Sequence, residues 1–200
     1  TKNIELEYSN KQITDSLNYA KNIQTSILES HNALDTNEIQ NFVSFHPRDI
    51  VSGDFYWSHQ VNSDVIVWVT ADCTGHGVPG ALLSIIGNVS LNKIVIEKGI
   101  SKVNLILDLL GKELDKTINY KLHSDGRLDG IDMSVCRFDR RTMKLTIAGA
   151  NSRMCLVQNK KLIEFKGDKM HVGHYSEKIV PFTEFTYQLE SGDTIYTFSD

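Results

Sequence analysis

The chain has 200 residues, a formal net charge of −4, and a composition that is 40% apolar and 23% charged. This length suits one well-cored domain better than two, and the composition is ordinary for a soluble globular protein. The negative net charge argues against a general nucleic-acid-binding protein, because contact with phosphates favours a basic surface. We therefore expect no nucleic-acid partner.

The cysteines indicate a reducing compartment. Cys73, Cys136 and Cys155 are odd in number and widely spaced, which is not the pattern of a disulfide framework. No run approaches the roughly 18 apolar residues that span a bilayer, and the N-terminus is too polar for a signal peptide. We expect a cytoplasmic segment without direct membrane contact, although a longer parent protein could be anchored through an upstream region.

Residues 4 to about 30 are predicted to form an amphipathic helix. Its apolar residues recur every three or four positions: Ile13, Leu17, Ala20, Ile23 and Ile27. This stripe either packs on its own domain or forms a short coiled-coil seam, as in a homodimer contact or a relay from an upstream domain. We divide the chain accordingly into a regulatory linker helix, residues 1–30, and a main domain, residues 31–200, which begins with a connector.

The main domain is predicted to have strands on both sides of two consecutive helices. Strand patterns cover residues 41–46, 54–61 and 64–70, and the third is apolar enough to be buried on both faces. Pro79 suits the first turn of a helix that runs to about Glu97, and a second helix covers about 103–121. Strand patterns follow at 130–138, 142–149, 153–158, 161–165, 182–189 and 194–199. This order favours an α+β domain with largely antiparallel sheets, and the helices packed together on one face.

Three aspartates are candidate metal ligands because each lies at a strand end or a sharp turn: Asp54, Asp72 and Asp200. Burying a carboxylate is costly unless it is solvated, hydrogen-bonded or bound to a cation, and Mg²⁺ and Mn²⁺ prefer oxygen ligands. The glycine-rich corner after Asp72 also lets backbone carbonyls turn towards a ligand. Any one such aspartate is more often a cap or turn former, so the residues alone support only a candidate oxygen-ligand site.

Other polar residues near these aspartates have two interpretations each. His76 is either a general acid or base beside a metal-bound water or a solvated side chain, and with Cys73 alone it does not make a zinc site. Arg48 either meets a phosphate with its planar fork or pairs with a surface carboxylate. The bends 130–132 and 149–151 either line the same cleft or serve only as turns.

Several motifs, in this order, resemble the SpoIIE-type (RsbU-like) branch of the PPM metal-dependent serine/threonine protein phosphatases. They are residues 51–57 (VSGDFYW), 71–81 (ADCTGHGVPGA), 129–134 (DGIDMS), 148–151 (AGAN) and the closing residues 192–200. The resemblance covers roughly residues 15–200. It implies an antiparallel β-sandwich flanked by helices, with two divalent cations, Mn²⁺ or Mg²⁺, in a cleft at one edge.

The resemblance also implies roles for the candidate residues. Asp72 would bridge both cations, the Cys73 carbonyl would ligate as well, Asp54 would hold one cation, and Asp200 would hold the other. A metal-activated water would attack the phosphorus of phosphoserine or phosphothreonine without a phosphoenzyme intermediate. His76 is the candidate that assists the leaving oxygen.

Arg48 and Asn151 are the candidate substrate-binding residues. The family resemblance implies that the substrate is a phosphorylated anti-sigma-factor antagonist or a related regulatory protein. The stretch 17–28 resembles the helix that joins an upstream sensor domain to the phosphatase in this family and controls metal binding.

Family members continue past the Ser-Asp-Gly motif to another metal-ligand aspartate, whereas this sequence stops at Asp200. We therefore expect a C-terminally truncated domain with weak or absent turnover on its own. Two alternatives stay open. One is a binding or sensing module on the same fold that has lost catalysis, and the other is a structural dimerisation segment with a globular cap.

Overall fold

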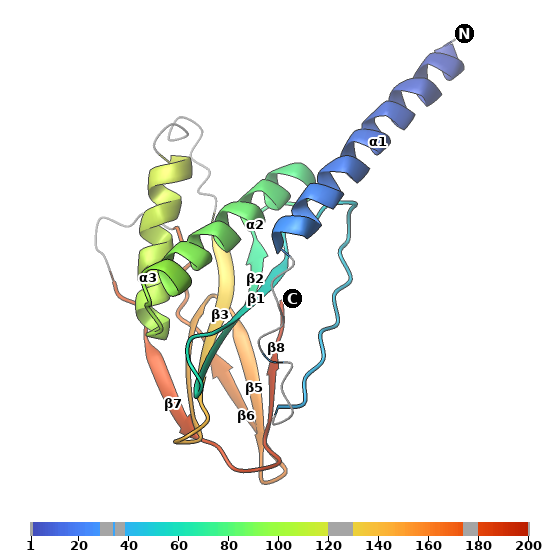
Figure 1. Cartoon of the computed structure of the whole chain (residues 1–200). Coiled ribbons are helices and arrows are strands. Elements are labelled where there is room, and N and C mark those ends of the chain that lie inside the picture. Colours follow the sequence, from blue (N-terminus) through green and yellow to red (C-terminus); the bar gives the residue numbers. More distant parts are fainter. Residues whose placement is uncertain (1, 29–33, 35–38, 120–129, 174–179, 200) are drawn as a thin grey trace.

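The computed structural model describes residues 2–28, 34, 39–119, 130–173 and 180–199. The chain begins with one helix, two strands follow, and two further helices precede the remaining strands (Figure 1). The helices are α1 (Lys2–Leu28), α2 (Gly77–Leu91) and α3 (Val103–Leu114); the π-helical turns η1 (Asn92–Glu97) and η2 (Asp115–Asn119) extend the last two. The strands are β1 (Phe55–Gln60), β2 (Val65–Cys73), β3 (Ile131–Asp139), β4 (Lys144–Ala150), β5 (Arg153–Gln158), β6 (Lys161–Lys166), β7 (Glu184–Gln188) and β8 (Thr194–Thr197).

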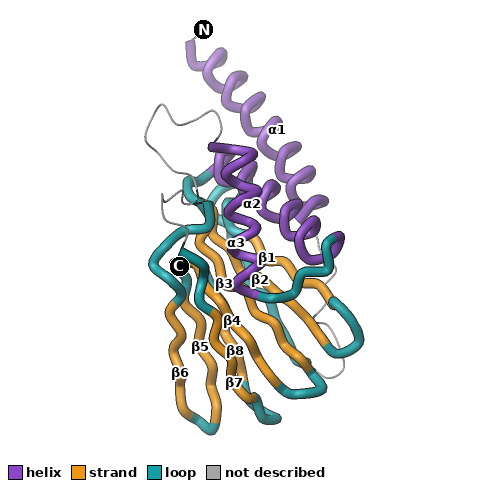
Figure 2. The backbone as a smooth tube through the Cα atoms, turned by 90° about the vertical axis from the view of Figure 1, so that its left-hand side faces the viewer, coloured by secondary structure: helices purple, strands orange, loops and turns teal. Residues whose placement is uncertain are grey.

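The strands form two antiparallel sheets. The larger has the order β1-β2-β3-β4-β7 and the smaller has the order β6-β5-β8. Helices α2 and α3 contact each other, α2 packs on β2, and α3 packs on β3 and β4. Figure 2 shows these helices on one side of the larger sheet, with the smaller sheet on the other side. The predicted α+β architecture with antiparallel sheets is confirmed, and the helices described here flank one sheet.

The two-residue period of β2 explains why this strand is apolar throughout. Val67 and Val69 face the helices and belong to the core cluster there, whereas Trp68 packs in the cluster between the sheets. Thr70 shares the face of Trp68, and its Oγ1 lies 2.8 Å from the Oγ1 of Thr197 on β8. The strand is therefore covered on both faces, as its sequence predicts.

The α3 helix shows how the helix-side core is built. Its buried residues follow the helical repeat, in steps of one, three or four: Val103, Ile106, Leu107, Leu110 and Leu114. These side chains meet the helix-facing residues of β3 and β4, including Val135 and Ala148. A second cluster lies between the sheets and includes Cys136, Leu145 and Phe165.

The prediction of a strand over residues 41–46 is wrong. This segment is extended but pairs with no strand among the described residues, and Phe42 is 76% exposed. It runs along the outside of the molecule in Figure 1, and the ring of Phe45 meets that of Tyr56 on β1 edge-on. Alternation of apolar and polar residues indicates a strand only where a partner strand is available.

The sequence-based expectation that no segment is apolar enough to cross a membrane is wrong by the criteria of length and composition. Residues Gly77–Glu97 form a 21-residue helix with a window of mean hydropathy 1.4, which is sufficient by length and composition. However, 56% of that window is buried inside the protein, where α2 and η1 contact β2 and α3. Its place in the core accounts for its composition, so it is weak evidence for a membrane span.

Helix α1 packs on the domain only through its C-terminal part. Gln24 is buried and Leu28 packs against the helix-side core, whereas Ile13, Ile23 and Ile27 of the predicted stripe are exposed. The N-terminal part of α1 projects away from the sheets in Figure 1. Whether these exposed residues form a seam with a second helix remains a prediction.

Replacing Leu107 by alanine should lower the free energy of unfolding by about 2–5 kcal/mol, because it removes a fully buried side chain and leaves a cavity. Leu105→Ala on the same helix is the matched control: Leu105 is 39% exposed, against 0% for Leu107, and its loss should cost under about 1 kcal/mol. Urea denaturation measures both. Equal losses for the two variants would contradict the described orientation of α3.

Candidate functional site

Strand register brings three aspartates to one end of the larger sheet. Asp54 immediately precedes β1, and Phe55 pairs with Ala71 on β2. On the other side of β2, Asp72 pairs with Asp132 of β3. Because side chains alternate along a strand, Asp72 and Asp132 lie on the Thr70 face, which is the face towards the smaller sheet.

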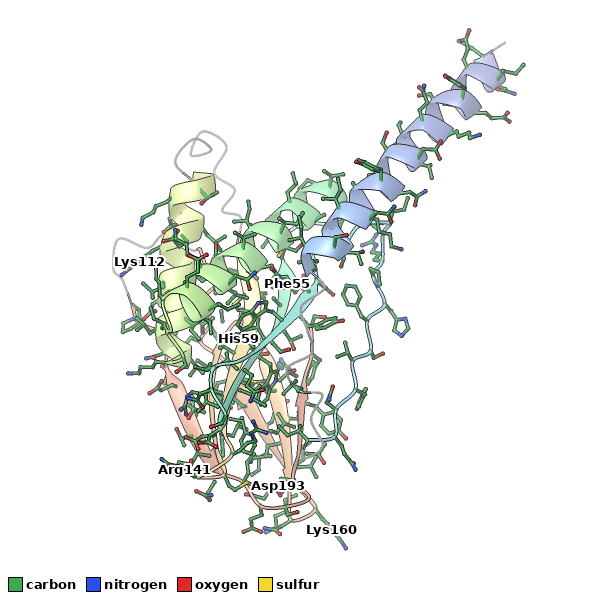
Figure 3. All side chains as sticks on the ribbon, in the orientation of Figure 1. Phe55, His59, Lys112, Arg141, Lys160 and Asp193 are labelled. Atoms are coloured by element: carbon green, nitrogen blue, oxygen red, sulfur yellow. The ribbon has the colours of Figure 1, made fainter. Side chains whose placement is uncertain are left out.

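An open depression of about 370 Å³ lies at this end of the sandwich. Its wall contains the sequence-predicted residues Arg48, Asp54, Asp72, Cys73 and His76, together with Asp49 and Asp132. Figure 3 labels Phe55, the neighbour of Asp54, close to this end, and shows Arg141, Lys160 and Asp193 at the opposite end. The predicted residues from 48 to 76 are therefore brought together.

Glycines let three backbone segments meet behind the depression. A Cβ on Gly80, in the first turn of α2, would lie 2.6 Å from the carbonyl oxygen of Gly75. A Cβ on Gly53 would lie 3.2 Å from the same oxygen and 3.3 Å from the carbonyl oxygen of Cys73. Gly75 also has a φ of +85°, which favours glycine. The turn before Asp54, the corner after Asp72 and the start of α2 thus fit together only without side chains.

Cys73 presents different chemistry from its side chain and its backbone. The side chain is 2% exposed and belongs to the helix-side core. Burial, and then the negative charges of Asp72 and Asp54, raise the pKa of the Cys73 thiol well above its ordinary value. A protonated, buried thiol is not a metal ligand, so only the carbonyl of this residue can contribute an oxygen to the depression.

His76 lies at the rim of the depression, directly before α2. Its side chain is 76% exposed, and its Nδ1 is 3.3 Å from the Oδ2 of Asp49. Arg48 is also exposed. Both residues are accessible to a ligand in the depression, and His76 is oriented by Asp49 rather than by Asp54 or Asp72.

The bends 130–132 and 149–151 come together around Asp132. The side-chain amide of Asn151 donates to Asp132 Oδ2 at 2.8 Å, and the ring Nδ1 of His171 is hydrogen-bonded to Asp132 Oδ1. Asn151 has a φ of +46°, and its backbone N–H donates to the carbonyl of Asp168 at 2.7 Å. Sequence reasoning left open whether these bends line the cleft or serve only as turns, and it did not identify His171.

Asp200 lies outside the described residues. The residue before it, Ser199, follows β8 and donates its hydroxyl to Asp54 Oδ2 at 3.1 Å. The end of the described chain therefore reaches the side chain of Asp54, although the two residues are 145 positions apart.

The donors around the depression are of the kind that hard cations prefer. They are carboxylates and backbone carbonyls, with the one nearby thiol turned away, which suits Mg²⁺ or Mn²⁺ better than zinc. Within the part of the chain that the structure describes, no three His, Cys, Asp or Glu side chains are close enough to hold a metal ion. Asp54 and Asp72 therefore remain candidate ligands without a third such described side chain beside them.

Gln24 is a buried connection that sequence reasoning missed. Its Nε2 donates to the Ser52 carbonyl at 2.6 Å and to Ser84 Oγ of α2 at 2.9 Å, and its Oε1 accepts from the Ser52 N–H at 3.1 Å. Gln24 lies seven residues after Leu17 and four after Ala20, so it continues the predicted stripe of α1. This spacing was the signal in the sequence that Gln24 faces the domain. Through Ser52, α1 holds the turn that carries Asp54.

Comparisons with known proteins identify the fold and the family. Residues 62–200 match the family model of Stage II sporulation protein E (SpoIIE). The SiaA-PP2C domain of Pseudomonas aeruginosa is 27% identical with a TM-score of 0.80, and the match covers 94% of this chain and 72% of that one. No match was found among curated proteins.

Two more distant solved structures share the fold. The PP2C phosphatase domain of SpoIIE from Bacillus subtilis, solved with a fragment of its regulatory domain, is 18% identical with a TM-score of 0.57, covering 72% of this chain and 39% of that one. The catalytic domain of the serine/threonine phosphatase PstP, solved in complex with two manganese ions, is 15% identical with a TM-score of 0.50, covering 72% and 69%.

Replacing Gln24 by leucine should lower the free energy of unfolding by about 1–3 kcal/mol, because the Ser52 N–H and carbonyl lose their buried partner. Gln12→Leu is the matched control on the same helix, since Gln12 is exposed, and it should change stability by less than about 0.5 kcal/mol. Urea denaturation followed by circular dichroism compares the two. A Gln24 variant as stable as the control would show that α1 does not support the Asp54 turn.

Proposed function

The chain belongs to the SpoIIE family of PP2C-type serine/threonine phosphatases, and we propose that it hydrolyses phosphoserine or phosphothreonine on a regulatory protein in the cytoplasm. The observation that carries the proposal is the meeting of Asp54 and Asp72 at one edge of the sandwich, beside the glycine corner. A phosphorylated anti-sigma-factor antagonist is the class of substrate we propose, from the resemblance to the RsbU-like branch of the family.

The charge of the depression supports a requirement for cations. Its wall carries four carboxylates, Asp49, Asp54, Asp72 and Asp132, against one guanidinium, that of Arg48. A phosphate dianion entering this wall would be repelled at short range. Divalent cations bound to the carboxylates would reverse that charge, so the wall suits a metal-dependent phosphatase better than a site that binds phosphate directly.

We assign the ligands by donor type and by the resemblance to the family. Asp54, Asp72, the Cys73 carbonyl and Asp200 would hold two divalent cations, Mn²⁺ or Mg²⁺. When bound, such ions lower the pKa of a water and stabilise the charge that develops on the phosphoryl group. The chain itself contributes orientation: the hydroxyl of Ser199 and the glycine corner position Asp54 and the carbonyls.

Substrate contacts are proposed for three residues around the cations. The exposed guanidinium of Arg48 has the planar fork that binds phosphate oxygens in pairs. His76, the sequence-based candidate for assisting the leaving oxygen, lies at the rim, where Asp49 orients it. Asn151 contacts Asp132, so we propose that it shapes the substrate side of the site through that residue as well as by direct contact.

Regulation is proposed to reach the site through α1. Gln24 joins this helix to the Asp54 turn and to α2, and the exposed Ile13, Ile23 and Ile27 leave an apolar surface for a second α1 helix or an upstream sensor domain. A shift of α1 would then move Ser52 and Asp54 together. A homodimer formed through this helix is part of the proposal.

Binding of Mn²⁺ measured by calorimetry tests the proposed site. Asp72→Asn should weaken binding about 100-fold or more, because it removes a central ligand rather than an outer partner. Asp15→Asn, on the exposed face of α1, removes the same charge far from the depression and should leave affinity unchanged. Release of phosphate from a phosphoserine protein should follow the same order.

Two results would contradict the proposal. Equal Mn²⁺ affinity for the wild type and Asp72→Asn would place the metal elsewhere. A folded wild type that neither binds Mn²⁺ nor releases phosphate would favour the alternative, a catalytically impaired binding or sensing module on the same fold. The observation that favours this impaired module is that the described residues hold no group of three side chains able to bind a metal ion.

A further inference from the structure

Asp132 is held on both of its carboxylate oxygens by residues from separate segments. The ring of His171 engages Oδ1, and the amide of Asn151 donates to Oδ2 at 2.8 Å. A carboxylate bound in this way cannot rotate freely, so it fixes the orientation of the imidazole that it contacts. Neither interaction is used by the ligand set proposed above.

The backbone around His171 is also fixed. Ile131 and Val172 exchange backbone hydrogen bonds of 3.0 Å in each direction, which places residues 171–172 beside the first residues of β3. A Cβ on Gly130 would lie 2.8 Å from the Cβ of His171, so glycine is what allows this close approach. The ring is therefore positioned by its side-chain partner and by the backbone on which it lies.

This pair lies next to the proposed metal ligands. Asp132 and Asp72 are partners in the antiparallel register of β2 and β3, where partner Cα atoms are about 4.5–5.5 Å apart. Asp132 lines the depression itself, and the side chain of His171 is 44% exposed. The imidazole thus reaches solvent beside the start of β3, whose Asp132 is the register partner of Asp72, with one ring nitrogen hydrogen-bonded to Asp132.

We propose that His171, oriented by Asp132 and Asn151, donates the proton to the seryl or threonyl oxygen that leaves the phosphate. The proposal rests on the phosphatase function above. With Nδ1 bound to the carboxylate, Nε2 is the nitrogen left to exchange a proton with a substrate. His171 takes the role that sequence reasoning gave to His76, whose partner Asp49 lies at the exposed rim.

In the proposed step, one bond to phosphorus breaks and another forms. The bond between phosphorus and the side-chain oxygen breaks, and that oxygen keeps the bonding electrons and takes the proton from Nε2 of His171. A water oxygen forms the new bond to phosphorus and gives up one proton to solvent, and the imidazole is protonated again from solvent. The products are the free hydroxyl side chain and inorganic phosphate.

Two substrates with different leaving groups test this role in the full chain with Mn²⁺. A seryl alkoxide needs a proton to leave, whereas the p-nitrophenolate of p-nitrophenyl phosphate leaves as an anion. His171→Gln should therefore lower kcat for a phosphoserine peptide about 100-fold or more and change kcat for p-nitrophenyl phosphate less than about threefold. His46→Gln, in an exposed segment, is the control and should change neither.

The second substrate also reports whether the variant is folded. Parallel losses on both substrates would mean that His171 only supports the structure, and no loss on the peptide would mean that it has no role. Either result overturns the proposal. A wild type inactive on both substrates would agree with the weak or absent turnover expected of these 200 residues alone, and a second measurement then tests the Asp132–His171 pair.

That measurement is the tautomer of His171 in the metal-free protein, from long-range ¹H–¹⁵N NMR spectra. The wild type should show the neutral ring protonated on Nδ1, with Asp132 accepting, and Asp132→Ala should lose this preference. A wild type protonated on Nε2 in its neutral form would show that Asp132 does not orient the ring, and would overturn the proposal independently of turnover.

Discussion

The register of β2 between β1 and β3 is the constraint on which the site depends. Val67, Val69 and Ala71 are held in the helix-side core, which forces Thr70 and Asp72 onto the opposite face. A slip of one residue would turn Asp72 into the apolar core and Cys73 towards the depression. The burial of three apolar side chains therefore also orients the carboxylate that the proposed chemistry requires.

Close backbone packing carries this constraint from the sheet to the surrounding segments. Gly53 and Gly80 lie against the carbonyl of Gly75, and Thr74 exchanges hydrogen bonds with Gly130 at the start of β3. The corner after Asp72 is thus fixed on several sides. Gln24 connects Ser52, two residues before Asp54, to α1, so that a helix with little contact to the domain still reaches the turn that carries Asp54.

Local sequence features predicted much of the fold. The alternating and apolar runs gave the strands from 54 onwards, and Pro79 after a glycine corner located the start of α2 to within two residues. Residues 41–46 were assigned wrongly because their alternation was not matched by a partner strand. The hydropathy of α2 and η1 was underestimated because their apolar residues face both the sheet and α3.

The candidate site was predictable as a set of motifs but not as an arrangement. Asp54 and Asp72 were found because each ends or precedes a strand, whereas the pairing of Asp72 with Asp132 depends on which strands are neighbours. His171 and Gln24 lie 39 and 28 residues from their partners Asp132 and Ser52. No local pattern reports contacts of that range, which tertiary packing decides.

Paramagnetic broadening by Mn²⁺ in two-dimensional amide NMR spectra is the most direct test of where cations bind. The account predicts that small additions of Mn²⁺ broaden the amide signals of Gly53, Asp54 and residues 72–75 first, and leave those of Arg141, Lys160 and Asp193 sharp at the far end of the sandwich. Broadening that begins at the far end, or that spreads evenly over the acidic surface, would contradict a cation site built from Asp54 and Asp72.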